Sequence, residues 1–506
     1  MDPTQLPDDV ETLKALLRQA LERNEQLQEQ IRMLLAKRFG PSSEKHAPEQ
    51  MGLFNEAEAD AGAQPVEAPA DETLTVPGHE RAKPGRRPLP ESLPRVEVVH
   101  DLPEAEKVCP HDGTALVRIG EETSEHLEII PAKVQVIRHV RLKYACPCCD
   151  AHVARAPAPP QLLPKSNAGP GLLAYVCTSK YVDALPLARQ EKMLARIGVE
   201  LPRATLAQWM MKLGEAVLPL INLMREQMLA YDLIQMDETT VQVLKEPGRA
   251  PSATSYFWVQ RGGPPHQPIL LFDYDPSRGQ GVPLRLLEGF AGYLQVDGYD
   301  GYNAVGKRDG ITLVGCWAHA RRKFDEAVKA QGAKAKPGRA TKGLNLIQRL
   351  YRVETLARDM GASARRALRE EQARPVLEEI RRWVDDSLPH VPPQSAVGKA
   401  LGYLDSQWHK LIGYLKDGRI AIDNNAAERA IRPFVIGRNN WLFSDTPKGA
   451  SASARLYSLI ETAKANGHEP WAYLNHLFKE LPTATTAEQL EALLPYNLSI
   501  EITAGG

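Results

Sequence analysis

The chain has 506 residues, of which 43% are hydrophobic and 25% are charged, so its composition is that of a globular protein rather than a disordered or fibrous one. At about 150 residues per domain, this length predicts roughly three folded units. No apolar run approaches the roughly 20 residues of a membrane-spanning helix, and the first residues are acidic where a signal peptide would be basic and then apolar. We therefore expect a cytoplasmic protein with no membrane partner.

The net charge of −1 hides an asymmetry along the chain. Residues 1–80 hold 7 basic and 16 acidic side chains, whereas residues 307–382 hold 19 basic and 9 acidic ones. An acidic first part and a basic later part fit a polyanionic partner.

Residues 1–40 predict a coiled-coil helix. Apolar side chains alternate three and four positions apart over four heptads, at Val10, Leu13, Leu17, Ala20, Leu27, Ile31 and Leu34. Asn24 occupies one of the seam positions, where a buried amide selects register and two-stranded pairing. The pattern favours a parallel homodimer; the alternative is a helix that packs on its own chain.

Residues 41–94 predict a linker that contains a basic patch. The segment 41–80 is rich in Pro, Ala and Glu and lacks periodicity. Arg86 and Arg87 then follow a glycine and precede a proline. Such arginines are candidate DNA contacts, because a narrow minor groove concentrates negative potential, but they also fit a solvated basic turn.

Residues 95–160 predict a zinc-ribbon-like domain. The candidate ligands are Cys109, His111, Cys146 and Cys149, with Cys148 as a further one. Tetrahedral zinc is often held by two chelating pairs on tight turns, and the spacing of the second pair fits this arrangement. The alternating run 133–140 predicts a strand between the pairs. A metal-free ribbon is the alternative.

Residues 165–228 predict a helical, helix-turn-helix-like DNA-binding domain. A turn at 198–202 separates two stretches with helical spacing of apolar residues. Arg203, Thr205 and Gln208 stand at the start of the second helix, where such motifs contact the groove. A plain helical hairpin is the alternative.

Residues 229–330 change to strand periodicity. Five strands are predicted, at 233–244, 255–261, 267–274, 291–298 and 311–317. Three meandering strands followed by β-α-β-α is the order of a ribonuclease-H-like α/β core, in which the first and fourth strands are neighbours. We expect a helical insertion at 331–415, the last part of the core at 416–445, and a C-terminal helical element at 446–506.

Three carboxylates stand on separate elements of this core. Asp237 lies in the first strand, Asp297 ends the fourth, and Glu428 lies on a later helix. Two divalent ions held by such acids, Mg²⁺ or Mn²⁺, would activate a nucleophile and stabilise the leaving oxygen of a phosphodiester. We therefore predict that these three residues are catalytic metal ligands.

Each acid also has a structural explanation. Asp237 could accept a hydrogen bond from Thr239 or Thr240, and its neighbour Glu238, on the opposite face of the strand, is a less favoured ligand. Asp297 lies in a turn that offers Asp300 as a rival. Glu428 could cap its own helix or pair with Arg432 one turn on.

Basic side chains cluster near two of these acids. His319, Arg322 and Lys323 open the helix after the fifth strand, and we interpret them as phosphate contacts, the alternative being a solvated helix face. Arg429 and Arg432, on the helix of Glu428, are further candidate DNA contacts.

At these motifs the sequence resembles the transposases of the insertion sequence 66 family. The motifs that carry the resemblance are Gly315-Cys-Trp-Ala-His-Ala-Arg-Arg-Lys-Phe324, Asp423-Asn-Asn-Ala-Ala-Glu-Arg-Ala-Ile-Arg-Pro433, Arg438-Asn-Asn-Trp-Leu-Phe443 and Ser458-Leu-Ile-Glu-Thr-Ala-Lys464. The resemblance implies DNA transposition by a DDE mechanism, with Asp237, Asp297 and Glu428 as the three acids. It also implies a helical insertion before the glutamate and accessory transposition proteins as partners. The zinc motif of the family begins Cys-Pro-x-Cys-Gly, and Asp112 stands at the second of these cysteines.

These observations predict a DNA transposase that binds terminal inverted repeats and target DNA and that acts at the bacterial nucleoid. Two other functions share much of the pattern. One is a DNA-binding regulator with an inactive nuclease fold, and the other is a ribonuclease-H-like nuclease without strand transfer.

Overall fold

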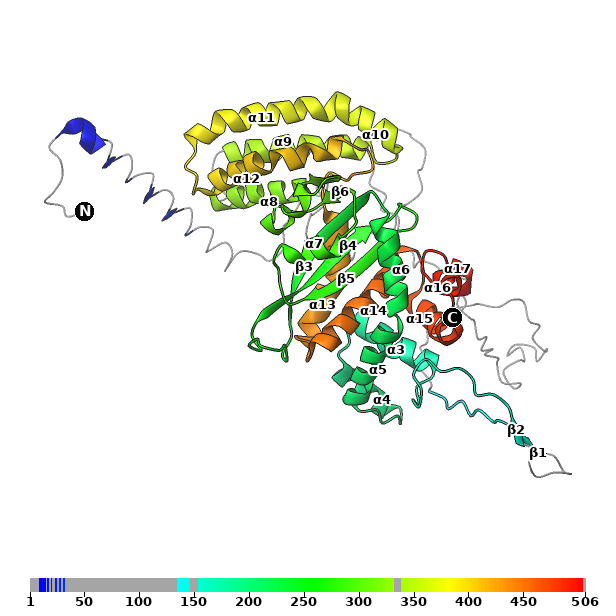
Figure 1. Cartoon of the computed structure of the whole chain (residues 1–506). Coiled ribbons are helices and arrows are strands. Elements are labelled where there is room, and N and C mark those ends of the chain that lie inside the picture. Colours follow the sequence, from blue (N-terminus) through cyan, green and yellow to red (C-terminus); the bar gives the residue numbers. More distant parts are fainter. Residues whose placement is uncertain are drawn as a thin grey trace, which may run out of the picture. The chain divides into compact units, whose positions relative to one another are not determined.

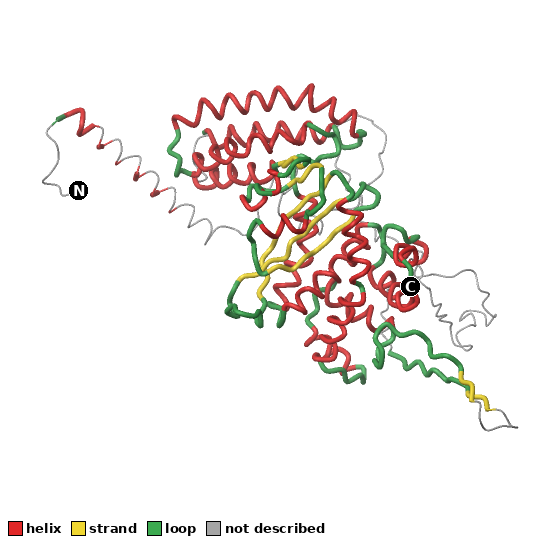
Figure 2. The backbone as a smooth tube through the Cα atoms, viewed as in Figure 1, coloured by secondary structure: helices red, strands yellow, loops and turns green. Residues whose placement is uncertain are grey.

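The computed structural model describes residues 134–145, 153–331 and 338–503, together with part of the stretch 9–31 (Figures 1 and 2). The predicted minor-groove arginines Arg86 and Arg87 lie outside the described residues. So do the candidate zinc ligands Cys109, His111, Cys146, Cys148 and Cys149. Within 9–31 the described residues from Val10 onward are helical, and seam positions such as Leu17 and Ile31 are exposed.

A five-stranded mixed sheet forms the centre of the described chain. Its strands are β3 (Leu233–Gln242), β4 (Thr254–Gly262), β5 (Ile269–Asp275), β6 (Gly292–Gln295) and β7 (Ile311–Val314). Their order is β5-β4-β3-β6-β7; β3, β4 and β5 pair antiparallel, whereas β6 and β7 run parallel to β3. The predicted adjacency of the first and fourth core strands is thereby confirmed.

Between β2 and the sheet, the described chain forms four α-helices. They are α3 (Pro170–Tyr181), α4 (Leu187–Arg196), α5 (Arg203–Ala216) and α6 (Leu218–Leu229). The turn between α4 and α5 contains Gly198 at φ +83°, a left-handed conformation that glycine adopts without steric cost. α5 buries Leu206 and Trp209 and exposes Arg203 and Gln208.

One short helix, α7 (Gly281–Leu286), lies between β5 and β6. A second group of helices follows β7. The group comprises α8 (Trp317–Gln331), α9 (Arg339–Leu356), α10 (Ala362–Leu368), α11 (Arg374–Ser387) and α12 (Ala396–Leu411). α8, α9, α11 and α12 pack on one another beside the side of the sheet formed by β6 and the edge strand β7 (Figure 1). They share a hydrophobic cluster centred on side chains such as Trp317, Phe324 and Leu350.

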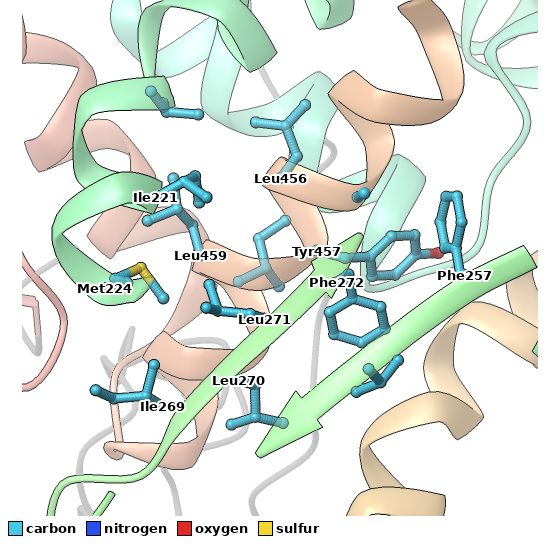
Figure 3. Close-up of a cluster of buried hydrophobic side chains, with 14 of the residues drawn as sticks. Ile221, Met224, Phe257, Ile269, Leu270, Leu271, Phe272, Leu456, Tyr457 and Leu459 are labelled. Atoms are coloured by element: carbon cyan, nitrogen blue, oxygen red, sulfur yellow. The ribbon is translucent and has the colours of Figure 1, made fainter. Parts of the chain in front are cut away.

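Five α-helices end the described chain, and the first two of them pack on the sheet. They are α13 (Asn425–Trp441), α14 (Pro447–Ala465), α15 (Pro470–Glu480), α16 (Ala487–Ala492) and α17 (Ile500–Thr503). α14 packs on the edge strand β5, and Figure 3 shows Leu456, Tyr457 and Leu459 against the side chains of this strand. The Ser458 hydroxyl accepts a 2.8 Å bond from the Phe272 N–H, and the Thr462 hydroxyl bonds both backbone groups of Leu270 at 3.0 Å. α14 therefore satisfies backbone groups that an edge strand would otherwise leave open.

Two predictions about strands are wrong. The described residues 134–142 form no strand and are exposed; the short pair β1 (Lys143–Ala145) and β2 (Val153–Arg155) follows them. Alternation alone does not make a strand without a second apolar surface, and Val136 is 93% exposed. In addition, β6 ends at Gln295, so Asp297 lies in the loop after the strand. Among the described helices, none has the length and apolar character that crossing a membrane requires.

Candidate active site

The structure brings the three predicted acids to one region of the sheet. Asp237 lies within β3, and the parallel partner of β3 is β6, with Gln235 opposite Gln295. Two residues further along each chain are Asp237 and Asp297, so the pairing register sets them level with each other. Glu428 stands in the first turn of α13, which packs on β3.

Buried amides fix the start of α13 over these strands. Gln235 Nε2 donates to Gln295 Oε1 at 2.7 Å, and Gln295 Nε2 donates to the carbonyl oxygen of Ala421 at 2.7 Å. Asn424, which is fully buried, donates from Nδ2 to the carbonyl oxygen of Met236 at 3.0 Å. The turn that precedes Glu428 is therefore bonded to both strands that position the aspartates.

The electrostatics of Asp237 reflect this gathering of like charges. Burial raises the pKa of Asp237 well above its usual value, and neighbouring negative charges raise it further. These charges belong to Glu238, Asp297 and Glu428. Asp237 Oδ1 accepts a 2.8 Å bond from the Glu238 N–H. The hydroxyls of Thr239 and Thr240, the expected partners of Asp237, instead accept hydrogen bonds from Arg438 of α13.

Two basic side chains of α8 approach Glu428. His319 Nδ1 lies 3.7 Å from Glu428 Oε1, and an Arg322 nitrogen lies 3.6 Å from Glu428 Oε2. Burial, followed by the positive charge of Arg322, lowers the pKa of His319 to about 4, so the imidazole is neutral at pH 7. α13 has no side-chain cap, so the capping interpretation of Glu428 is wrong. The third basic residue, Lys323, lies 5.0 Å from the ring centroid of Tyr403.

The two rival acids have other partners. Glu238 is held by Arg278 at 2.6 Å and by the Tyr302 hydroxyl at 2.5 Å, although its charge still reaches Asp297. Asp300 is exposed and accepts a 3.0 Å bond from Asn303 Nδ2. Glu238 is thus engaged by Arg278 and Tyr302, although its charge raises the pKa of Asp237 more than the charges of Asp297 and Glu428 do.

The donor set fits a divalent cation. Carboxylate oxygens are the ligands that Mg²⁺ and Mn²⁺ prefer, and the mutual repulsion at Asp237 is the charge imbalance that such a cation would offset. One ligand atom each from Cys316, His319 and Glu428 also lie within 4.8 Å of one another. Burial raises the pKa of the Cys316 thiol, however, and this favours the protonated form, which is not a ligand.

The helical group contributes contacts that sequence reasoning missed. The Tyr351 hydroxyl of α9 donates to Asp423 Oδ2 at 2.9 Å, directly before α13. The ammonium group of Lys410, at the end of α12, donates to Asn303 Oδ1 at 2.7 Å in the segment after Asp297. No local pattern announces either contact, because both join residues more than 70 positions apart.

The remaining predicted contacts occupy two helices. Arg203, Thr205 and Gln208 lie on α5, which carries none of the three acids. Arg429 and Arg432 lie on α13 within about one turn of Glu428, Arg429 being exposed and Arg432 partly buried.

Two hydrophobic clusters meet at the acids. Ile420 and Ile422 belong to the cluster of the helical group, whereas Ala430 and Ile431 belong to the cluster around the sheet. The chain therefore passes from one cluster to the other across the segment that carries Glu428.

Comparison with known proteins places the chain among mobile-element enzymes. Residues 165–452 match the family model described as "Transposase IS66 family" and residues 106–150 that of the "zinc-finger binding domain of transposase IS66". Residues 26–98 match "Transposase C of IS166 homeodomain", across the boundary predicted between coiled coil and linker, and residues 458–496 match "IS66 C-terminal element".

Similar full-length relatives occur in Sinorhizobium fredii (strain NBRC 101917 / NGR234). The uncharacterized protein y4qI is 32% identical over 504 residues, which cover 97% of this chain and 92% of the relative. The uncharacterized protein y4jD is 33% identical over 423 residues, covering 81% of each chain. The class of protein is thus a transposase. The chain belongs to the IS66 transposase family, as its motifs predict.

Proposed function

We propose that the protein is a DDE transposase with a ribonuclease-H-like core, which cleaves the ends of its element and joins them to target DNA. The observation that carries this proposal is the convergence of Asp237, Asp297 and Glu428, in which both other acids raise the pKa of Asp237. The sheet order β5-β4-β3-β6-β7 supports the assignment of the core.

The chemistry requires a nucleophile and a leaving oxygen in line at one phosphorus atom. Bound divalent ions would activate the water or 3′-hydroxyl and stabilise the leaving oxygen. The three carboxylates would bind these ions through hard oxygen atoms. Arg322, partly exposed beside Glu428, would contact a non-bridging phosphate oxygen. The same acids would serve hydrolysis and strand transfer.

The other modules would recognise DNA and pair the ends. Arg203 and Gln208 on the exposed face of α5 are available to a groove, and the exposed heptad positions between Val10 and Ile31 would pair two chains. The candidate zinc ligands would hold a structural zinc ion, and accessory proteins encoded by the same element would be partners. DNA affinity should fall steeply as salt rises. Protein binding releases cations condensed on the DNA phosphates, and this release is less favourable at high salt.

The test uses the full chain and a duplex that carries the inverted repeats of its own element. Asp237→Asn and Asp297→Asn should bind this duplex as the wild type does but lose nicking and joining with Mg²⁺ by at least about 100-fold. Asp300→Asn is the matched control and should keep its activity within about 10-fold.

Three results separate the candidate functions. Nicking and joining by the wild type support the transposase. Binding without metal-dependent nicking would instead support the inactive regulator, and nicking without joining would support the simple nuclease. Full activity of Asp237→Asn would remove Asp237 from the site.

A further inference from the structure

The helical group α8–α12 reaches the turn that opens α13. Tyr351 on α9 donates its hydroxyl to Asp423 Oδ2 at 2.9 Å. Asp423 in turn accepts bonds from Asn425, at 3.2 Å from the backbone N–H to Oδ1 and at 3.1 Å from Nδ2 to Oδ2. Asp423 thus joins a tyrosine of the helical group to the first residue of the helix that carries Glu428.

The path from this turn to Glu428 is short and rigid. Asn424 is fully buried and bonded through its side chain to β3, and its carbonyl oxygen accepts the backbone N–H of Glu428 at 3.2 Å. A displacement of Asp423 would therefore rotate the first turn of α13 and move the Glu428 carboxylate away from the two aspartates.

The same helical group also contacts the loop of the second acid. Lys410 is only 3% exposed, and its ammonium group donates to Asn303 Oδ1, whose side chain donates to Asp300. The ring of Tyr403 covers Gly298, where an added Cβ would lie 2.6 Å from a ring carbon. Only glycine next to Asp297 lets this ring approach so closely.

We propose that the helical group completes the active site, with Tyr351 as a positioning residue that orients Glu428 through the Asp423 carboxylate. This inference rests on the proposed function of the three acids. It assigns to α9 a role in catalysis that is separate from any contact of its basic surface with DNA.

Removing the Tyr351 hydroxyl should change metal affinity more than folding stability. Removing the hydroxyl leaves Asp423 with its Asn425 bonds but without the donor that fixes its rotamer. Losing a partner bonded directly to a metal ligand costs about 10-fold to 100-fold in metal affinity or activity, and Tyr351 acts one contact further out, through Asp423, so we expect the lower end of this range. DNA affinity should stay unchanged, because the Tyr351 hydroxyl is engaged with Asp423 and its partly buried ring packs against the hydrophobic cluster of the helical group.

The test compares Tyr351→Phe with Tyr414→Phe in the full chain. Tyr414 lies in the short 3₁₀ helix Ile412–Leu415 that follows α12 and belongs to the hydrophobic cluster of the helical group. It is fully buried, and its hydroxyl has no hydrogen-bond partner within the described part of the chain. Each variant loses one hydroxyl and keeps its ring. Mn²⁺ binding would be measured by electron paramagnetic resonance without DNA, next to DNA affinity, end-cleavage rate and thermal unfolding.

We expect Tyr351→Phe to weaken Mn²⁺ binding and slow cleavage by about 10-fold, with high Mn²⁺ restoring part of the rate, while DNA affinity matches that of Tyr414→Phe. The melting temperature of Tyr351→Phe should fall below that of Tyr414→Phe by no more than the loss of one hydrogen bond explains. Asp423→Asn should give the same loss, and the double variant should not lose more, because both act through one contact.

Two results would overturn the inference. One is wild-type Mn²⁺ binding and cleavage in Tyr351→Phe. The other is a parallel loss of DNA affinity and thermal stability, which would make the contact merely structural. An inactive wild-type chain would instead refute the proposed function, so the two failures are distinguishable.

Discussion

The side-chain amide of Gln235 donates a 2.7 Å hydrogen bond to the amide oxygen of Gln295, and both residues are buried between neighbouring parallel strands. Gln295 passes the connection on to the carbonyl oxygen of Ala421, before α13. A polar pair in the middle of a sheet is costly unless every group is bonded, and here the bonds align the strands of the two aspartates with the helix of the glutamate.

Replacing Gln295 tests this alignment. Gln295→Leu leaves the Ala421 carbonyl without its partner and the Gln235 amide with only its 3.4 Å bond to the Asp423 carbonyl oxygen, so the free energy of unfolding should fall by about 1–3 kcal/mol. Cleavage should fall as well. Gln242→Leu, at an exposed position of β3, should stay within about 0.5 kcal/mol of the wild type in urea denaturation. Equal stability of the two variants would show that the pair is not structurally important.

The raised pKa of Asp237 predicts a pH-dependent stability. A carboxyl whose pKa is raised by folding stabilises the folded state only while it is protonated, and this stabilisation is lost as pH rises through the folded pKa. Without divalent ions, Asp237→Asn should therefore melt at a higher temperature than the wild type at pH 7.5. The gap should shrink as pH falls toward the ordinary value of 3.8.

Calorimetry with a chelator at pH 7.5 and pH 5 measures this gap. Addition of Ca²⁺, which binds carboxylates, should stabilise the wild type and leave Asp237→Asn almost unchanged. A gap of the same size at both pH values would contradict the electrostatic explanation.

The hydroxyl groups of α14 that bond the backbone of β5 should contribute to the free energy of unfolding. Ser458→Ala removes the acceptor of the Phe272 N–H. Thr462→Val removes the one hydroxyl that bonds both the N–H and the carbonyl oxygen of Leu270. Each should cost about 1–3 kcal/mol in chemical denaturation, because a buried backbone group loses its partner. Ser451→Ala on the same helix is the control. A cost no greater than that of the control would mean that water or a shift of the helix replaces these bonds.

The zinc site stays a prediction from sequence and family, because its ligands lie outside the described residues. Elemental analysis of the purified full chain should find about one zinc per chain if His111 or Cys148 takes the place of the missing second cysteine. The double variant Cys146→Ser, Cys149→Ser should lose this zinc, whereas Cys177→Ala, in buried α3, should keep it. A zinc-free wild type would leave a ribbon held by packing alone.

Sequence reasoning works best here where period and order carry the information. The alternation around Asp237 predicts a strand, and the order of the five strands predicts that β3 and β6 are neighbours. It is wrong for the described residues 134–140, whose alternation reflects no buried face.

The partners of the acids were less accessible to prediction. The sequence predicts His319 as a phosphate contact, whereas its ring lies beside Glu428; no sequence pattern indicates the contacts of Tyr351 and Lys410. Each depends on how the helical group packs against the sheet. Such packing joins side chains remote in sequence and leaves no periodic trace, whereas the type of an element does.

The change of hydrophobic cluster between Ile422 and Ala430 has a consequence for thermal inactivation. Segments with separate cores open in separate cooperative steps, and the weaker step occurs first on warming. If α8–α12 loosen first, Glu428 is released from its neighbours while the five strands stay intact. Catalytic activity would then be lost at a lower temperature than the circular dichroism signal of the sheet. A brief heat pulse would yield an enzyme that keeps its sheet, is inactive, and regains activity on cooling.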